Sequence, residues 1–181
     1  MKTLISLLLI LGCSCSVFAQ FQQGAYTQYS LSTPMRANLN SDNEDEYWFT
    51  PNGLNFKFGE GLHFNRKIAM GLNSGIDWIA SKKLVVVPAF ANLKFSLKLD
   101  PETFFYIETD YGKSIIIGRG NLHGDYKKIG LGIEGIEGPA VFIELTQYGF
   151  KLDSEEKVAT INLGISFSSF RKNSKARSNH E

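Results

Sequence analysis

From residue 53 onward, the chain is a series of strand-length segments in which apolar and polar residues alternate. Between positions 84 and 99, for example, the odd positions are apolar, and the even positions from 92 to 98 are polar or charged. A repeat of two residues places alternate side chains on opposite faces of a β-strand, which a helix does not do. This segment is about three times as long as an ordinary strand. A strand that crosses a lipid bilayer is one reason for such a length.

Size and charge narrow the possible classes of protein. The 181 residues predict one domain. A net charge of +1 argues against a nucleic-acid-binding protein on electrostatic grounds. The chain has no internal run of about eighteen apolar residues, so no transmembrane helix is predicted.

The N-terminal segment 1–19 indicates a secretory signal peptide. It has a positively charged start, a short apolar stretch and a small-residue cleavage site at 17–19. The alternative is a lipoprotein signal that ends in an acylated Cys13. If cleavage follows Ala19, both Cys13 and Cys15 are removed, and the mature chain has no cysteine and no disulfide.

The mature chain is predicted to form an all-β domain over residues 20–170, followed by a disordered basic tail at 171–181. The eight predicted strands span 24–31, 53–64, 68–80, 84–99, 103–114, 126–134, 139–152 and 158–169. Long connections are expected at 32–52 and 117–125, and most of the others are short. Short turns at one end and longer loops at the other are typical of an outer-membrane barrel, with both termini at the short-turn end.

Alternation alone leaves two barrels open. A soluble barrel places its apolar face inside, and a membrane barrel places it outside. The charges of the polar face nearly balance, which suits an enclosed lumen where unpaired charge would be costly. They are Lys57, Lys94, Lys98 and Lys128 against Asp77, Glu108, Asp110, Glu134 and Glu144.

Glycines also gather on the polar face, where they would leave room for large side chains in a narrow lumen. They are Gly59, Gly61, Gly71, Gly75, Gly112, Gly130, Gly132 and Gly164. The apolar faces are nearly free of charge apart from Lys113 and Lys127, and aromatic residues near strand ends suit interfacial girdles. We therefore predict a closed, antiparallel, up-and-down transmembrane barrel.

Two residues disturb this pattern. Glu60 falls on the apolar side of its strand between two glycines, and a glycine bulge there would rotate it inward. Pro88 removes a backbone donor from the strand at 84–99, which suggests a bulge or a strand end. The strand register near both residues stays open at this stage.

With its leader, its eight strands and an alternating final strand, the chain resembles the small outer-membrane β-barrel proteins of Gram-negative bacteria. That family's last strand carries an assembly signal, which Asn162, Gly164 and Phe167 match. Ser169 departs from it, because another apolar residue is expected there. The resemblance implies an outer-membrane location and contact with lipid and with the barrel assembly machinery. It carries no catalytic residues.

Few residues suggest a catalytic or ligand-binding role. His63 is predicted to form hydrogen bonds in the lumen or at its rim. His123 and Asp125, with Ser114 and Arg119 upstream, would sit at the outer rim in a lipid-modifying enzyme. An ordinary polar loop with turn-forming glycines is the favoured explanation, because the spacing of single residues is weak evidence.

Four further segments have ordinary explanations. The glycine-bearing loop at 118–124 lacks the helix that a phosphate site would need. The acidic run at 42–46 lacks the glycine and the spacing of a calcium loop. The aromatic cluster at 47–49 suits a girdle. The basic tail, with Arg171, Lys172, Lys175 and Arg177, carries charge that suits anionic head groups, but a flexible soluble terminus is the favoured explanation.

The sequence thus predicts a monomeric outer-membrane barrel with a side-chain-filled lumen and a structural or surface-binding role through its outer loops. No catalytic residue, cofactor or metal site is assigned, and a nucleic-acid partner is not expected. Two alternatives remain: a rim-sited lipid-modifying enzyme, and a soluble secreted barrel that binds an apolar ligand.

Overall fold

A computed structural model describes residues 23–37, 49–117, 123–151 and 157–172, and within these ranges the chain is folded into antiparallel strands. In the described ranges, no helix is long and apolar enough to cross a bilayer. The strands are β1 (Gln23–Ala37), β2 (Phe49–Pro51), β3 (Gly53–Phe64), β4 (Ile68–Ile79), β5 (Leu84–Lys98), β6 (Thr103–Ile117), β7 (His123–Gly135), β8 (Pro139–Lys151) and β9 (Lys157–Lys172).

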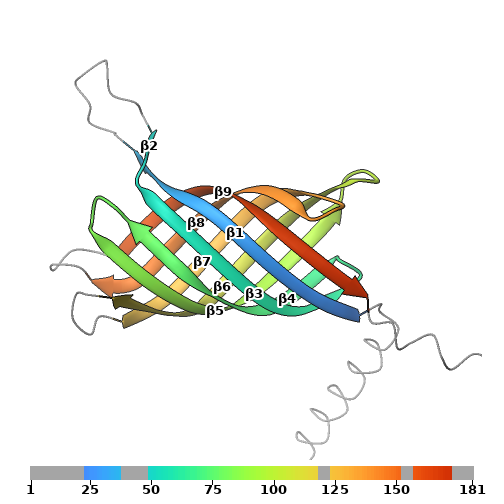
Figure 1. Ribbon diagram of the computed structural model, residues 1–181, viewed down its shortest axis with the longest axis horizontal. Helices are drawn as coiled ribbons and strands as arrows, with labels where there is room; N and C mark the ends of the chain where they lie inside the picture. Colours follow the sequence, from blue (N-terminus) through green and yellow to red (C-terminus); the bar gives the residue numbers. More distant parts are fainter. Residues whose placement is uncertain (1–22, 38–48, 118–122, 152–156, 173–181) are drawn as a thin grey trace, which may run out of the picture.

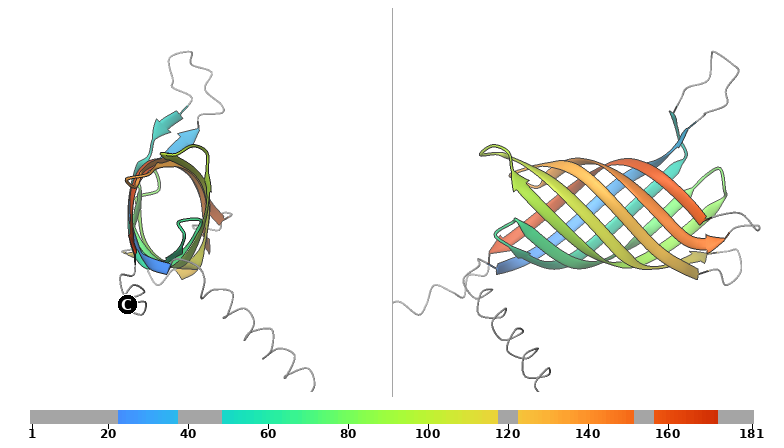
Figure 2. Two further views of the ribbon diagram at one scale, coloured as in Figure 1. Left: turned by 90° about the vertical axis from the view of Figure 1, so that its right-hand side faces the viewer. Right: turned by 180° about the vertical axis from the view of Figure 1, so that it is seen from behind.

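Eight of these strands close into a barrel (Figures 1 and 2). Each long strand pairs with its neighbour in sequence, and β1 pairs with β9 to complete the ring. The short β2 pairs only with the end of β1, so it extends the first hairpin and adds no strand to the wall. The predicted eight-stranded antiparallel barrel is confirmed.

The strands are strongly tilted, as the register shows. A path along paired residues starts at Ala25 on β1 and returns to the same strand at Met35, a shift of ten positions. With eight strands, such a stagger goes with a tilt of roughly 35–45°. The path runs through Leu62, Met70, Leu93, Thr109, Ile129, Leu145 and Ile161.

The two ends of the barrel differ. At one end, which we call the turn end, the turns 65–67, 99–102 and 136–138 lie with the start of β1 and the end of β9. At the other, the loop end, β1 and β2 project beyond the wall as a hairpin (Figure 2). This confirms the expected arrangement of short turns at the terminal end.

Several strands are longer than the sequence predicts. β1 continues to Ala37 and β2 covers Phe49–Pro51, although 32–52 was expected to be a loop. Ser32 and Pro34 are buried on the lumen side of β1. The lack of large apolar residues at these two positions therefore indicates the inward face of a strand and not a loop. β6 and β7 likewise extend into the predicted 117–125 loop, and β9 includes two residues of the predicted tail.

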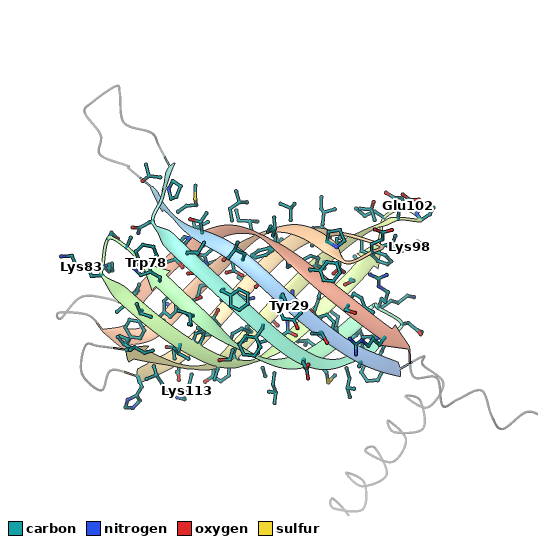
Figure 3. The ribbon with its side chains drawn as sticks, in the orientation of Figure 1. Tyr29, Trp78, Lys83, Lys98, Glu102 and Lys113 are labelled. Carbon is teal, nitrogen blue, oxygen red and sulfur yellow. The ribbon has the colours of Figure 1, made fainter. Side chains whose placement is uncertain are left out.

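Apolar side chains point outward along every wall strand. Leu72 is the most exposed of the large hydrophobic side chains in the described residues, at 76%. The inward positions hold most of the predicted charges, which are buried. This is the reverse of a soluble barrel and the arrangement that lipid-facing barrels have. Figure 3 shows the outward side chains around the wall.

The glycine bulge expected at Glu60 and the bulge or strand end expected at Pro88 do not occur in β3 and β5. Glu60 pairs with Thr27 and Leu72 in an unbroken register, so no bulge turns it inward and its side chain is exposed on the outer face. At Pro88 the β4–β5 ladder skips two residues of each strand and resumes in the same register, because proline removes one donor without inserting a residue.

Inward glycines make room for large neighbours, as predicted. A Cβ atom on Gly132 would lie 2.5 Å from Cζ of the Tyr106 ring, and one on Gly59 would overlap the side chain of Asn73. Gly130, two residues away on the same strand, has no such constraint, since its nearest side-chain atom would be Glu144 Cβ at 3.5 Å.

We predict that Gly132→Ala destabilises the folded barrel by about 1–3 kcal/mol, because the new methyl group displaces the Tyr106 ring. Gly130→Ala is the matched control, and its stability should be unchanged or higher by up to about 1 kcal/mol. Urea unfolding in lipid vesicles measures both. Equal stability of the two variants would show that the lumen is not tightly packed at Tyr106.

Candidate functional site

The middle of the lumen is organised around Lys128 of β7. Its Nζ lies 2.6 Å from Oε1 of Glu108, 2.7 Å from Oδ2 of Asp110 and 3.3 Å from Oε2 of Glu144. All four side chains are buried. A cation held among three carboxylates in a space closed to solvent is a strongly coupled network, because the removal of one member leaves charges without compensation.

Two further lysines form buried ion pairs in the lumen. Lys57 Nζ lies 2.9 Å from Oε1 of Glu144 and 3.7 Å from Oδ1 of Asp77. Closer to the turn end, Lys94 Nζ lies 2.9 Å from Oε1 of Glu134 and 4.1 Å from the centre of the Tyr106 ring. Ion pairs thus connect β3, β4, β6, β7 and β8, and the Lys57–Glu144 pair joins β3 to β8, which are not neighbours in the wall. A separate pair connects β5 with β7.

The predicted charge balance needs one correction. Lys98 is exposed, because it is the last residue of β5 at the turn end. The buried lumen of the described residues therefore holds three ammonium groups, from Lys57, Lys94 and Lys128, against the five predicted carboxylates. Hydrogen bonds stabilise two of these five carboxylates, which outnumber the ammonium groups. Asn162 donates to Glu144 at 3.0 Å, and the Tyr148 hydroxyl donates to Asp77 at 2.7 Å.

At the loop end the lumen is apolar, which the sequence analysis missed. A cluster of buried side chains fills this end, and the Phe90 and Tyr126 rings stack at 4.7 Å between centroids. A signal was present, since residues 84–90 are apolar on both faces of the strand. The members are Ile79, Leu84, Val86, Phe90, Ile116, Tyr126, Tyr148, Phe150 and Val158.

The turn end is covered by Arg66, from the β3–β4 turn. Its guanidinium lies 4.3 Å from the centre of the Phe170 ring and 5.1 Å from that of Phe104, and it donates to the Ile136 carbonyl at 2.7 Å. His63 is buried beside it, and its Nε2 lies 3.3 Å from the Arg171 carbonyl oxygen. The prediction of His63 as a hydrogen-bonding residue of the lumen or rim is confirmed.

The cavities next to Lys128 are small. Two interior cavities flank Lys128, each with a volume of about 10 Å³. A cavity of that size holds about one water molecule.

The base of the projecting hairpin is fastened to the rim. The Asn52 side chain donates to the Ser81 hydroxyl at 2.8 Å and accepts from the Ser81 backbone N–H at 2.9 Å. The Thr33 hydroxyl donates to the Gly53 carbonyl at 2.9 Å. The β1–β2 hairpin is therefore held to the β4–β5 turn, although it extends past the wall.

The candidate catalytic residues are not assembled. Ser114 is buried on the lumen side and donates to the Gly124 carbonyl at 3.4 Å, whereas His123 and Asp125 point to the outer face. Asp125 forms an ion pair with Lys113 at 2.6 Å. The barrel wall thus separates Ser114 from the other two side chains. Arg119, the acidic run at 42–46 and Tyr47 and Trp48 of the aromatic cluster lie outside the described residues.

No protein-family model matches the chain, and no curated protein matches its sequence. The fold does match solved structures. Neisserial surface protein A superposes with a TM-score of 0.57 at 10% identity, covering 80% of this chain and 96% of that protein.

The outer membrane protein Ail of Yersinia pestis, determined in a phospholipid bilayer nanodisc, gives a TM-score of 0.51 at 13% identity, over 81% of this chain and 99% of Ail. The chain has the fold of small outer-membrane β-barrels. The barrel's own features, an apolar outer face and ion pairs inside, agree with that fold.

We predict that Lys128→Met destabilises the barrel by about 3–5 kcal/mol, because three carboxylates lose their shared cation in a buried site. Lys113→Met is the control. It breaks an exposed pair with Asp125 and should cost no more than about 1 kcal/mol. The shift of the urea midpoint in vesicles compares the two, and similar shifts would contradict the central role of Lys128.

Proposed function

We propose that this chain is an outer-membrane protein that acts at the cell surface through its loop end, with a structural or surface-binding role. The observation that carries the proposal is the distribution of polarity in the wall, with apolar side chains outside and ion pairs inside. A solvated protein would not expose so many large apolar groups over one continuous belt. In this proposal, residues 1–19 direct export, outer-membrane lipid contacts the wall, and the barrel assembly machinery inserts it.

The filled lumen supports a role other than conduction. The Lys128 network occupies the middle, the apolar cluster fills the loop end, and Arg66 covers the turn end. Interior spaces of about 10 Å³ offer no path for a solute. Activity is therefore assigned to surfaces outside the lumen, and the anchored β1–β2 hairpin is the part of the described chain that projects farthest (Figure 2).

The two structural relatives support this location. One is named a surface protein and the other an outer membrane protein. Their likeness to this chain is one of fold, and the ligand of the loops is left open. No observation favours the lipid-modifying enzyme, since Ser114 and His123 lie on opposite faces of the wall.

The location is tested by fractionation of the expressed protein, followed by electrophoresis with and without boiling. The proposal predicts recovery in the outer membrane and a compact unboiled band that shifts on heating. A freely soluble protein without that shift would contradict it, and the apolar face would then be examined as a ligand surface.

Surface display is tested with a protease site inserted in the β1–β2 connection at 38–48, and a second site inserted in the 99–102 turn as the control. On intact cells, protease should cut the first and spare the second. Cleavage of only the second would invert the orientation and overturn the proposed role of the loop end.

A further inference from the structure

Glu60 is a carboxylate on the outer face of the wall, within the span of β3. It lies four residues before the end of β3 at Phe64 and seven after its start at Gly53. Outward charges in the loop-end half of the wall have partners: Lys113 pairs with Asp125, and the Lys127 ammonium lies 6.0 Å from the centre of the Tyr111 ring. Within the described residues, no side chain forms a hydrogen bond or ion pair with Glu60. An ionisable group in this position usually marks a functional contact.

The surroundings of Glu60 include hydrogen-bond donors and recessed surface. Thr27 is its direct cross-strand neighbour on β1, and Tyr29 follows Thr27 on the same outward face. These side chains, with Phe58, Gly59 and Leu72, line a hollow of about 280 Å³. Figure 3 shows Tyr29 near the middle of the wall.

A larger apolar groove of about 510 Å³ lies on the other side of Tyr29. It is formed by outward side chains of β1 and β9, such as Leu31, Ile165 and Phe167, with parts of β3, β7 and β8. Leu72 projects on the opposite side of Glu60, on β4, and is 76% exposed. The face thus carries a donor–acceptor pair at its centre, a groove on one side and a projecting leucine on the other.

We infer that a second copy of this chain packs on the β1–β3–β4 face, with the Glu60 carboxylate of each copy accepting a hydrogen bond from the Thr27 hydroxyl of the other. A two-fold axis along the membrane normal, passing between Thr27 and Glu60, exchanges these residues and keeps each at its own depth in the bilayer. The same rotation brings each Leu72 over the groove of the other copy.

Lipid is a poorer partner for the Glu60 carboxylate than a second copy of the chain. Acyl chains have no hydrogen-bond donor, and polar head groups lie at the bilayer surface, away from the middle of the wall. A copy of the same chain supplies donors at the required depth, and side-chain hydrogen bonds between membrane segments favour association. This inference replaces the monomer expected from sequence. It leaves the loop end free, so it does not depend on the proposed function.

Cysteine cross-linking in native membranes tests the inference. Phe58→Cys, an outward position two residues before Glu60 that leaves Thr27 and Glu60 intact, is compared with Leu131→Cys, an outward position on β7 across the barrel. Both are made in the background Cys13→Ser, Cys15→Ser and treated with a short bis-maleimide. A product of twice the chain mass is expected for Phe58→Cys and not for Leu131→Cys. No product, equal products at both positions, or a product mainly with another protein would overturn the inference.

Glu60→Leu, added to Phe58→Cys, tests the role of the carboxylate while the Thr27 hydroxyl is kept. This change replaces a charge by an apolar group on the lipid-facing surface, so the barrel should still fold, which the heat-shift gel verifies. The cross-linked fraction should fall by roughly fivefold as two intermolecular hydrogen bonds are lost. An unchanged fraction in a folded variant would overturn the assignment of Glu60.

Discussion

The structure depends on the closure of the sheet by the pairing of β1 with β9. A bilayer offers no hydrogen-bond partners, so each backbone N–H and C=O of a spanning sheet must be paired within the protein. Closure removes both edges, and the stagger of ten positions fixes the tilt and hence the width of the lumen. Alternation then sends every second side chain to the outer face and the rest to a narrow interior.

The interior follows from that width. Glycines such as Gly132 leave room for large neighbouring side chains. Buried charges are stabilised by ion pairs with opposite charges, as in the pair of Lys128 with Glu108. The network lies in the middle, the apolar cluster at the loop end and Arg66 at the turn end. This packing supports the two proposals that place activity on outer surfaces: at the loop end and, through Glu60, on the outer face of the wall.

Much of this was predictable from sequence because a membrane imposes the alternation directly. The strands between 53 and 98 were assigned to within one residue at each end, and the inward glycines and most lumen charges were assigned correctly. The strand at 32–37 was missed because its polarity resembles that of a loop. Lys98 and Glu60 were misjudged because their positions depend on strand ends and on an unbroken register. The apolar loop end was overlooked because 84–90 is apolar on both faces, so alternation gives no signal there.

The central claim is that the apolar face of the wall contacts lipid and the polar face does not. It is tested most directly by tryptophan fluorescence in vesicles of brominated lipid, with Trp48 and Trp78 replaced by phenylalanine. Ile143 points outward and its neighbour Phe142 points into the lumen. The account predicts strong quenching for Ile143→Trp and little for Phe142→Trp. An unquenched Ile143→Trp variant would contradict it.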